Sequence, residues 1–238
     1  LRSTVKIGTA RNIIIPILEE TGKNFEIAVC PERTLEGQAL EELNSLPQII
    51  GSDSQSTLFR AGKVFNFLTP TILRVNSLET AEVIKLVDNT YRDVMFGFAN
   101  EVARLCDAVG ISAHEVIKSG KLGYERTNVA SPGPVGGPCL EKDPHILAES
   151  ARSYGIDLDI TPASRRVNER QPLEVVNFIK KTARLKKDFP LQPKISLLGI
   201  AFKGKPETND LRGTVAKPIL DLINKEFPNS ILQGFDPA

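Results

Sequence analysis

Several features that mark common protein classes are absent from this chain. No apolar run reaches the roughly 18 residues that a membrane-spanning helix needs, so we expect no membrane partner. The 30 Lys and Arg residues nearly balance the 29 Asp and Glu residues, which leaves no bulk attraction to nucleic acid or to a membrane surface. The chain begins at Leu1 and shows no signal-peptide pattern.

Cysteine and histidine are scarce. The three cysteines, Cys30, Cys106 and Cys139, are odd in number and far apart, which indicates reduced thiols and a cytoplasmic protein. Neither His114 nor His145 stands at metal-ligand spacing from a cysteine, so we predict no zinc or other metal site.

The G-x-G-x-x-G fingerprint of a dinucleotide-binding domain is also missing. Even so, residues 1–72 alternate short apolar runs with helical stretches, which predicts βαβ units and a parallel sheet. We expect strands at 25–30, 48–52 and 65–68, and helices at 12–20, 40–43 and 54–63 with Asp53 or Ser54 as the cap of the last. This segment resembles the second half of a nucleotide-binding domain.

The longest helical pattern covers residues 77–109. Apolar residues recur there in steps of three and four, Asn76 is the expected N-cap with Glu79 completing a capping box, and Gly110 is the expected stop. At 1.5 Å per residue such a helix is roughly 50 Å long. A helix of that length is expected to cross between domains or to build a dimer interface.

Further helices are expected at 112–118, in the apolar pattern of residues 146–154, and at 173–185. A second βαβ unit is expected at 194–235, with strands at 194–203 and 231–235 and a helix at 214–227 between them. The fold class is therefore α/β, with partial Rossmann-like parallel sheets flanking a central all-helical domain that contains the long helix. We divide the chain into residues 1–72, 73–190 and 191–238. The last two strands and one helix are too few to bury a core, so the chain is expected to be truncated at both ends.

The most informative stretch is residues 135–144, in which two glycines and a proline precede Cys139. A helix beginning nearby would favour a thiolate at Cys139, and the glycines would let the backbone approach a ligand. Asp143, one turn on and on the same face, could hold or deprotonate a reacting group. A buried structural cysteine at a helix entry is the alternative, and this stretch alone leaves the choice open.

Other candidates carry similar ambiguity. Glu32 and Glu36 follow an expected strand and could do acid/base work or form a charged turn. Lys85 and Asn89 share a helix face and could stabilise an oxyanion or be merely solvated. The Gly- and Pro-rich loop of residues 120–138 directly precedes Cys139 in the chain, and long ordered loops of this kind are usually functional.

Taken together, the motifs resemble those of the UDP-sugar 6-dehydrogenase family. The resemblance rests on Ser3-Thr4-Val5, the segment 31–37, Lys85 to Asn89, Gly136 to Pro144, and Gly199 to Lys203 followed by Asp210-Leu211-Arg212. The Pro-Glu-Arg form of residues 31–33 and the proline after Asp143 are closer to the UDP-N-acetylmannosamine branch than to the UDP-glucose branch.

The resemblance implies a four-electron oxidation of a sugar C6 alcohol with NAD as the cofactor. Cys139 would form a thiohemiacetal and then a thioester, and Lys85 and Asn89 would stabilise oxyanions. Asp143 would act through a water or hold the partner of the nucleophile, Glu32 would be the base for hydrolysis, and Thr4 would position its water.

The resemblance also implies binding residues and a partner. The substrate residues would be Arg33, Thr34, Leu35, Glu36, Arg126, Asn128, Gly136 and Lys203. The cofactor residues would be Thr4, Lys142 and Arg212. A homodimer through the helix of residues 77–109 is expected, with no nucleic acid or membrane partner.

Three alternatives remain open at this stage. One is a UDP-glucose 6-dehydrogenase, and a second is a non-catalytic fragment that dimerises or binds a UDP-sugar. The third is a two-electron hydroxyacid dehydrogenase, whose chemistry needs no cysteine. The segment that would distinguish NAD from NADP is not in the sequence.

Overall fold

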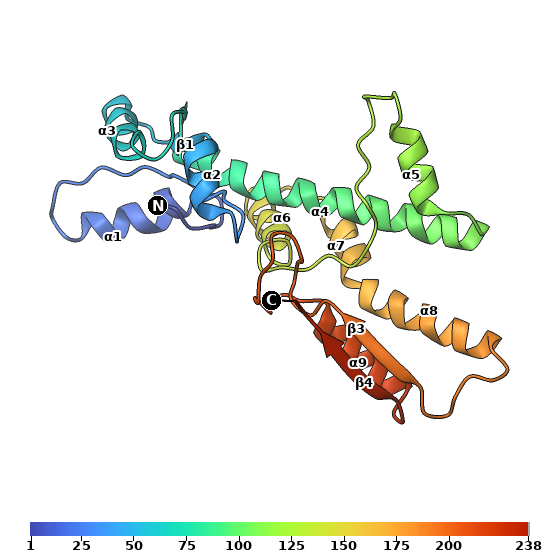
Figure 1. The fold of residues 1–238 in the computed structure, drawn as a ribbon. Helices are drawn as coiled ribbons and strands as arrows, with labels where there is room; N and C mark the ends of the chain where they lie inside the picture. The colour runs from blue at the N-terminus through green and yellow to red at the C-terminus, as the bar shows by residue number, and fades with distance from the viewer. Residues whose placement is uncertain (238) are drawn as a thin grey trace. The chain divides into compact units, whose positions relative to one another are not determined.

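The computed structural model describes residues 1–237 (Figure 1). They divide into two compact units. The N-terminal unit contains Leu1–Thr90 and Asp143–Leu158. The C-terminal unit contains Tyr91–Lys142 and the chain from Asp159 onward. Each unit combines helices with a two-stranded sheet, which confirms the α/β class.

Both sheets are parallel and each is built from a βαβ unit. In the N-terminal unit β1 (Gln48–Gly51) pairs with β2 (Ile72–Val75), and α3 (Gln55–Phe65) connects them. In the C-terminal unit β3 (Lys194–Leu198) pairs with β4 (Ile231–Phe235), and α9 (Ala216–Glu226) connects them. The predicted βαβ pattern is confirmed in both places.

Strand β1 organises the core of the N-terminal unit. Successive side chains of a strand point to opposite faces, so Ile49 and Ile50 enter different clusters. Ile49 packs with Val29, Leu78 and Ala81, among others. Ile50 packs with Cys30 and Leu58. This explains why every residue of the short strand is buried.

Helix α3 begins after Ser54, whose side chain accepts a hydrogen bond from the backbone N–H of Thr57 at 3.3 Å. Of the two predicted N-cap candidates, Asp53 and Ser54, the cap is therefore Ser54. The helix α2 (Ala39–Ser45) lies where a helix was expected.

Two predicted strands of the N-terminal unit are wrong. Residues 25–30 form no strand, and Val29 makes only an isolated antiparallel bridge to Gly51. The next N–H, that of Cys30, donates to the carbonyl of Leu1 at 2.7 Å. The apolar alternation there reflects packing of Val29 and Cys30 into the two clusters rather than a ladder.

The predicted strand at 65–68 is instead the last residue of a helix and the turn that follows it. Helix α3 continues to Phe65, whose carbonyl accepts from the N–H groups of Leu68 and Thr69 at 2.9 and 3.1 Å. Phe65 packs against the cluster around Ile50. The second strand of the sheet comes later, as β2.

The first helical segment is a π-helical turn, η1 (Ala10–Ile14), followed by α1 (Ile15–Glu19). Its first turn is capped by the buried carboxylate of Glu82, which accepts from the N–H groups of Gly8 at 2.6 Å and Ala10 at 2.9 Å. Free N–H groups at a helix start need such acceptors when they are buried.

The long helix α4 (Leu78–Val109) has 32 residues, close to the predicted span. Its cap is Ser77 rather than Asn76, because the Ser77 hydroxyl accepts from the N–H of Thr80 at 3.0 Å. The predicted stop is confirmed. Gly110 has a φ of 80°, and its N–H and that of Ile111 both reach the carbonyl of Cys106.

The remaining helices are α5 (Ala113–Lys121), α6 (Asp143–Ser153), α7 (Ile160–Glu169) and α8 (Gln171–Leu185). The pattern of residues 160–169 had not been recognised as helical. In the C-terminal unit, Val176 of α8 packs with Ile219 and Ile223 of α9 to form the core.

The strand expected at 194–203 ends at Leu198. Beyond it, the N–H groups of Ile200 and Ala201 donate to the carboxylate of Asp236 at 2.6 and 2.8 Å instead of to a neighbouring strand.

Among the described residues, no helix combines the length and the apolar character needed to cross a membrane.

Glu82 gives the N-terminal unit a pH dependence of known sign. Burial raises the pKa of Glu82, and the hydrogen bonds from Ala10 and Gly8 offset this only in part. The folded state therefore holds the proton to a higher pH than the unfolded chain does. The stabilisation is full below the unfolded pKa of about 4.5 and is lost as the pH rises through the folded pKa.

We therefore expect the difference in free energy of unfolding between the unmodified chain and Glu82→Gln, both measured by urea titration, to shift against the unmodified chain as the pH rises above about 4.5. Glu20→Gln, at an exposed carboxyl near the end of the same helical segment, is the control. Parallel pH curves for the unmodified chain and Glu82→Gln would contradict this assignment.

Candidate functional site

Cys139 is the exposed thiol among the three free cysteines, since Cys30 and Cys106 are buried. It lies in the turn that precedes α6, which begins at Asp143. The alternative of a buried structural cysteine therefore does not apply. The expectation that Asp143 and Cys139 share one helix face is wrong, because Cys139 is not part of the helix.

The glycines before Cys139 allow close packing within the C-terminal unit. The N–H of Gly137 donates to the carbonyl of Gly213 at 2.8 Å, and a Cβ on Gly137 would lie 2.7 Å from the ring of Phe202. A Cβ on Gly136 would collide with the carbonyl of Gly213. The predicted substrate residue Gly136 thus has a demonstrable packing reason for lacking a side chain.

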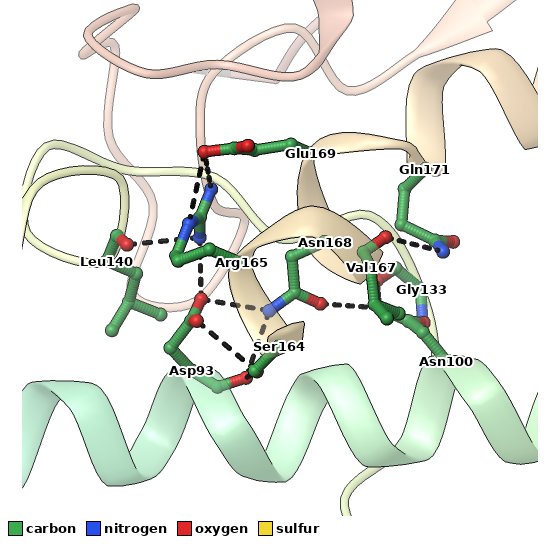
Figure 2. Close-up of polar contacts among 10 residues, drawn as sticks. All are labelled: Asp93, Asn100, Gly133, Leu140, Ser164, Arg165, Val167, Asn168, Glu169 and Gln171. Atoms are coloured by element: carbon green, nitrogen blue, oxygen red, sulfur yellow. Dashed lines mark hydrogen bonds and ion pairs between the residues drawn. The ribbon is translucent and has the colours of Figure 1, made fainter. Parts of the chain in front are cut away.

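A buried polar network lies beside this loop (Figure 2). Its centre is Asp93 on α4, whose side chain is fully buried and forms an ion pair with Arg165 of α7 at 2.6 Å. The same guanidinium nitrogen donates to the carbonyl of Leu140 at 3.1 Å. Asn168 donates to both the carboxylate and the carbonyl of Asp93 at 2.9 Å. The buried charge of Asp93 is therefore paired and hydrogen-bonded, as such a charge requires.

The network continues along α4 to Asn100. The amide of Asn100 donates to Asn168 at 3.0 Å and to the carbonyl of Gly133 at 3.1 Å, and it accepts from the N–H of Gly133 at 2.8 Å. Ser164 adds a hydrogen bond to the carbonyl of Asp93 at 3.0 Å.

Sequence reasoning missed this network, although a signal was present. Asp93, Gly97 and Asn100 recur at helical spacing and form a small and polar stripe on a long helix. The glycine is required because a Cβ on Gly97 would collide with the side chain of Ser164. A buried polar stripe predicts a partner with matching groups, and that partner was α7, the helix that had not been recognised.

The N-terminal unit brings together two of the predicted catalytic residues. The amide of Asn89 donates to the carboxylate of Asp143 at 2.5 Å, and both side chains are buried. Lys85 lies one turn earlier on α4 and is half-buried. Its ammonium has no hydrogen bond or ion pair to any residue within 1–237, so it is available to a ligand.

Glu32 is held by Arg2 and by the backbone of Thr34. Its carboxylate forms an ion pair with Arg2 and accepts from the N–H of Thr34 at 2.8 Å. Burial favours a higher pKa for Glu32, but the hydrogen bonds from Thr34 and Arg2 outweigh it and the pKa is lowered. Glu32 is therefore ionised at neutral pH. Thr4 is half-buried, and no hydrogen bond joins it to Glu32 within the described chain.

The residues that follow Glu32 also form polar contacts within the N-terminal unit. Arg33 forms an ion pair with Asp88 at 3.0 Å, and the N–H of Leu35 donates to the carboxylate of Glu42. Glu36 is exposed. A hollow beside this segment measures only about 20 Å³, roughly the space of one water molecule. These contacts fit the charged-turn interpretation without removing the catalytic one.

The other predicted binding residues lie in the C-terminal unit. Arg126 is exposed and stacks 4.6 Å over the ring of Tyr124, while Asn128 and Lys142 are also exposed. Lys203 stacks 5.3 Å over the ring of Phe202. Arg212 is exposed and pairs with the carboxylate of Asp210 at 2.6 Å.

A larger hollow of about 510 Å³ adjoins the loop before Cys139, a size typical of small-molecule sites. It is lined by residues that include Gly136, Glu141, Arg165, Thr214 and Lys217. Of the predicted substrate residues, Gly136 lines it. Within residues 1–237, His, Cys, Asp and Glu side chains form no cluster of three or more that could hold a metal ion.

The fit of the N-terminal unit to a dinucleotide is partial. The parallel β1-α3-β2 unit has the topology of such domains. The G-x-G-x-x-G fingerprint does not occur within residues 1–237, and the N–H groups of Gly8 and Ala10 are already bonded to Glu82.

Two family models match the chain. The model for the NAD binding domain of the UDP-glucose/GDP-mannose dehydrogenase family matches residues 1–69. The model for the central domain of the same family matches residues 79–170.

Curated relatives agree with these matches. The UDP-N-acetyl-D-mannosamine dehydrogenase of Methanococcus maripaludis is 32% identical over 100% of this chain and 52% of its own length. The Campylobacter jejuni protein of the same name is 34% identical over 98% of this chain and 58% of its own length. The chain thus spans about half the length of the curated relatives it matches.

Solved structures give the same result. A UDP-D-ManNAc dehydrogenase from Pyrococcus horikoshii matches with a TM-score of 0.88 and 30% identity, over 99% of this chain and 56% of that one. A UDP-glucose dehydrogenase from Pyrobaculum islandicum matches with a TM-score of 0.86 and 27% identity, over 99% and 54%. With two of the family's domain models matched in order and whole-chain likeness in sequence and structure, this chain belongs to the UDP-glucose/GDP-mannose dehydrogenase family.

Proposed function

We propose that this chain serves an NAD-dependent, four-electron oxidation of the C6 alcohol of UDP-N-acetyl-D-mannosamine to the uronate. The observation that carries the proposal is the exposed thiol of Cys139 on a glycine loop packed tightly against its own unit. A two-electron alcohol oxidation needs no such nucleophile. The names of the matched relatives support the choice of sugar.

Cys139 would act on the aldehyde formed by the first oxidation. Its thiolate sulfur attacks C6, a C–S bond forms, and the carbonyl electron pair moves onto oxygen to give a thiohemiacetal. NAD, when bound, supplies the hydride acceptor for both oxidations, from alcohol to aldehyde and from thiohemiacetal to thioester. Covalent capture keeps the reactive aldehyde in the site.

Lys85 and Asn89 would stabilise the negative oxygen at each stage. The ammonium of Lys85 is half-buried and has no polar partner within residues 1–237, which leaves its charge for a ligand. The amide of Asn89 is oriented by its hydrogen bond to Asp143. We infer that Asp143 acts mainly by holding Asn89 in place, since its carboxylate is fully buried.

Glu32 would accept a proton from the water that hydrolyses the thioester, with Thr4 positioning that water. Oxygen of the water bonds to C6, the C–S bond breaks, and the sulfur leaves as a thiolate. The lowered pKa of Glu32 keeps it ionised and ready to accept a proton at neutral pH. Its ion pair with Arg2 makes it a weaker base than a free carboxylate would be.

The remaining assignments stay predictions. We propose contacts to the UDP-sugar from Arg33, Thr34, Leu35, Glu36, Arg126, Asn128, Gly136 and Lys203. We propose contacts to NAD from Thr4, Lys142 and Arg212. The division at residues 72 and 190 and a cytoplasmic location, which the unpaired thiols support, are proposals of the same kind.

We also propose that a second copy of the chain covers α4. Large apolar side chains are exposed there at intervals of seven, seven and four residues, which places them on one stripe of the helix. Their exposed fractions are 61% for Tyr91, 56% for Phe98, 64% for Leu105 and 63% for Val109. Exposed apolar stripes of this kind mark association surfaces.

One observation favours a second candidate. The G-x-G-x-x-G fingerprint does not occur within residues 1–237, and the second candidate is a fragment that binds a UDP-sugar and dimerises without turnover. UDP-glucose remains the alternative substrate, as one matched structure is a UDP-glucose dehydrogenase.

Cys139→Ala is the first test of the proposed chemistry. We expect the unmodified chain to form two NADH per uronate with UDP-N-acetyl-D-mannosamine, followed by absorbance, and Cys139→Ala to form no uronate. UDP-glucose and UDP-N-acetylglucosamine are offered separately, and Cys106→Ala is the control. A folded chain without NADH formation on any sugar would favour the binding fragment, and uronate formation by Cys139→Ala would refute the mechanism.

Lys85→Met separates oxyanion stabilisation from folding. Because no polar partner of Lys85 is lost, we expect the unfolding midpoint to stay within about 2 °C of that of the unmodified chain. We expect kcat to fall by about 10²–10³ with little change in KM, as for loss of one oxyanion donor. Lys118→Met, at an exposed position on α5, is the control, and an unchanged kcat in Lys85→Met would remove Lys85 from the site.

The proposed dimer is tested by placing a charge in the stripe. Phe98→Glu is expected to shift the mass measured by light scattering after gel filtration from that of two chains to that of one, because burying a carboxylate is costly. Leu122→Glu, at a residue 87% exposed and outside the stripe, should leave the mass unchanged. A monomeric unmodified chain would contradict the proposal.

A further inference from the structure

We propose that the buried network of Asp93, Asn100, Arg165 and Asn168 is a positioning device that fixes both ends of the loop carrying Cys139. This cysteine loop is defined as residues 133–140. The inference rests on the proposed function, in which Cys139 is the nucleophile, and it assigns positioning residues that motif reasoning did not find.

The downstream end of the loop is held by Arg165. Leu140 follows Cys139 directly in the chain, so a shift of the Leu140 carbonyl moves the backbone of the nucleophile. That carbonyl accepts from the Arg165 guanidinium at 3.1 Å, while the same nitrogen donates to Asp93 at 2.6 Å. The Arg165 side chain is only 6% exposed, so water competes little for these bonds.

The upstream end of the loop is held by Asn100. Its side-chain amide both accepts from the N–H of Gly133 at 2.8 Å and donates to the carbonyl of Gly133 at 3.1 Å. Two bonds to one residue fix its orientation as well as its position. Asn100 is only 2% exposed.

The two anchors are one network and not two independent contacts. Asn168 donates to Asp93 and accepts from Asn100, so it joins the two ends through side chains on α4 and α7 (Figure 2). The hydrogen bond from Gly137 to Gly213 restrains the loop between the anchors. A nucleophile gains most when its supporting residues are themselves locked by buried bonds on rigid helices.

A simpler role would be to clamp α4 against α7. The bonds of Asp93 with Ser164, Arg165 and Asn168 serve that role by themselves. The bonds from Asn100 to Gly133 and from Arg165 to Leu140 do not, because they end on loop backbone. These extra bonds distinguish a device for the loop from a helix clamp.

The test measures backbone amide hydrogen exchange of the folded full chain by mass spectrometry. Asn100→Ala frees the upstream end and Arg165→Lys weakens the downstream end. Asn177→Ala and Arg170→Lys, at exposed positions on α8 and at its start, are the matched controls. We expect exchange of residues 134–142 to rise at least about fivefold in both test variants and to stay within about twofold in α8 and in the controls.

Two results would overturn the proposal. One is unchanged exchange of residues 134–142 in both folded test variants. The other is an equal rise throughout the C-terminal unit, which is the result for a helix clamp. If Asn100→Ala does not fold, Asn100→Asp replaces it, because it keeps an acceptor for the N–H of Gly133 but loses the donated bonds.

Exchange needs no turnover, so this test is independent of the proposed function. A chain that forms no NADH would count against the dehydrogenase proposal, while the exchange result would still decide whether the network holds the loop. Where NADH forms, we expect Asn100→Ala to lower kcat at least about tenfold with KM for the UDP-sugar unchanged, because positioning acts on the reacting geometry.

Discussion

The fully buried carboxylate of Asp93 is the constraint on which the C-terminal unit depends. A charge removed from water must be paired and hydrogen-bonded, and truncating one partner of such a pair typically costs about 3–5 kcal/mol. Arg165 meets this demand. It also donates a hydrogen bond to the backbone carbonyl of Leu140, which follows Cys139 in the chain. One electrostatic requirement therefore joins helix packing to the placement of the candidate nucleophile.

The faces of helix α4 differ in the groups that they present. Lys85, Asn89 and Asp93 lie one helical turn apart. Lys85 has no polar partner within residues 1–237 and is open to a ligand. Asn89 bonds to a carboxylate, and Asp93 bonds to a guanidinium. Another face exposes the apolar stripe that we propose for dimerisation. Groups that make or are proposed to make contacts therefore occur along most of this long helix.

Much of the fold was predictable from local signals. The long helix with its Gly110 stop, the helix after Ser54 and both βαβ units followed from periodicity and caps. The errors at residues 25–30 and 65–68 arose because short apolar runs look alike whether they pair in a sheet or only pack into a core. The candidate site residues were named from motifs and stay predictions, whereas Arg165 and Asn168 were missed, since a buried polar residue shows its purpose only through its partner.

The sequence by itself determined the family, through short motifs in a fixed order, and it determined which residue types are available for chemistry. Those motifs are readable because each requirement is local, such as a glycine where two stretches of backbone must approach. Only the tertiary structure decided that Cys139 is exposed, that Asp143 is bonded to Asn89, and that the ends of the cysteine loop are held by α4 and α7. These facts depend on contacts between residues far apart in the chain, and no local pattern specifies which distant partner satisfies a buried polar group.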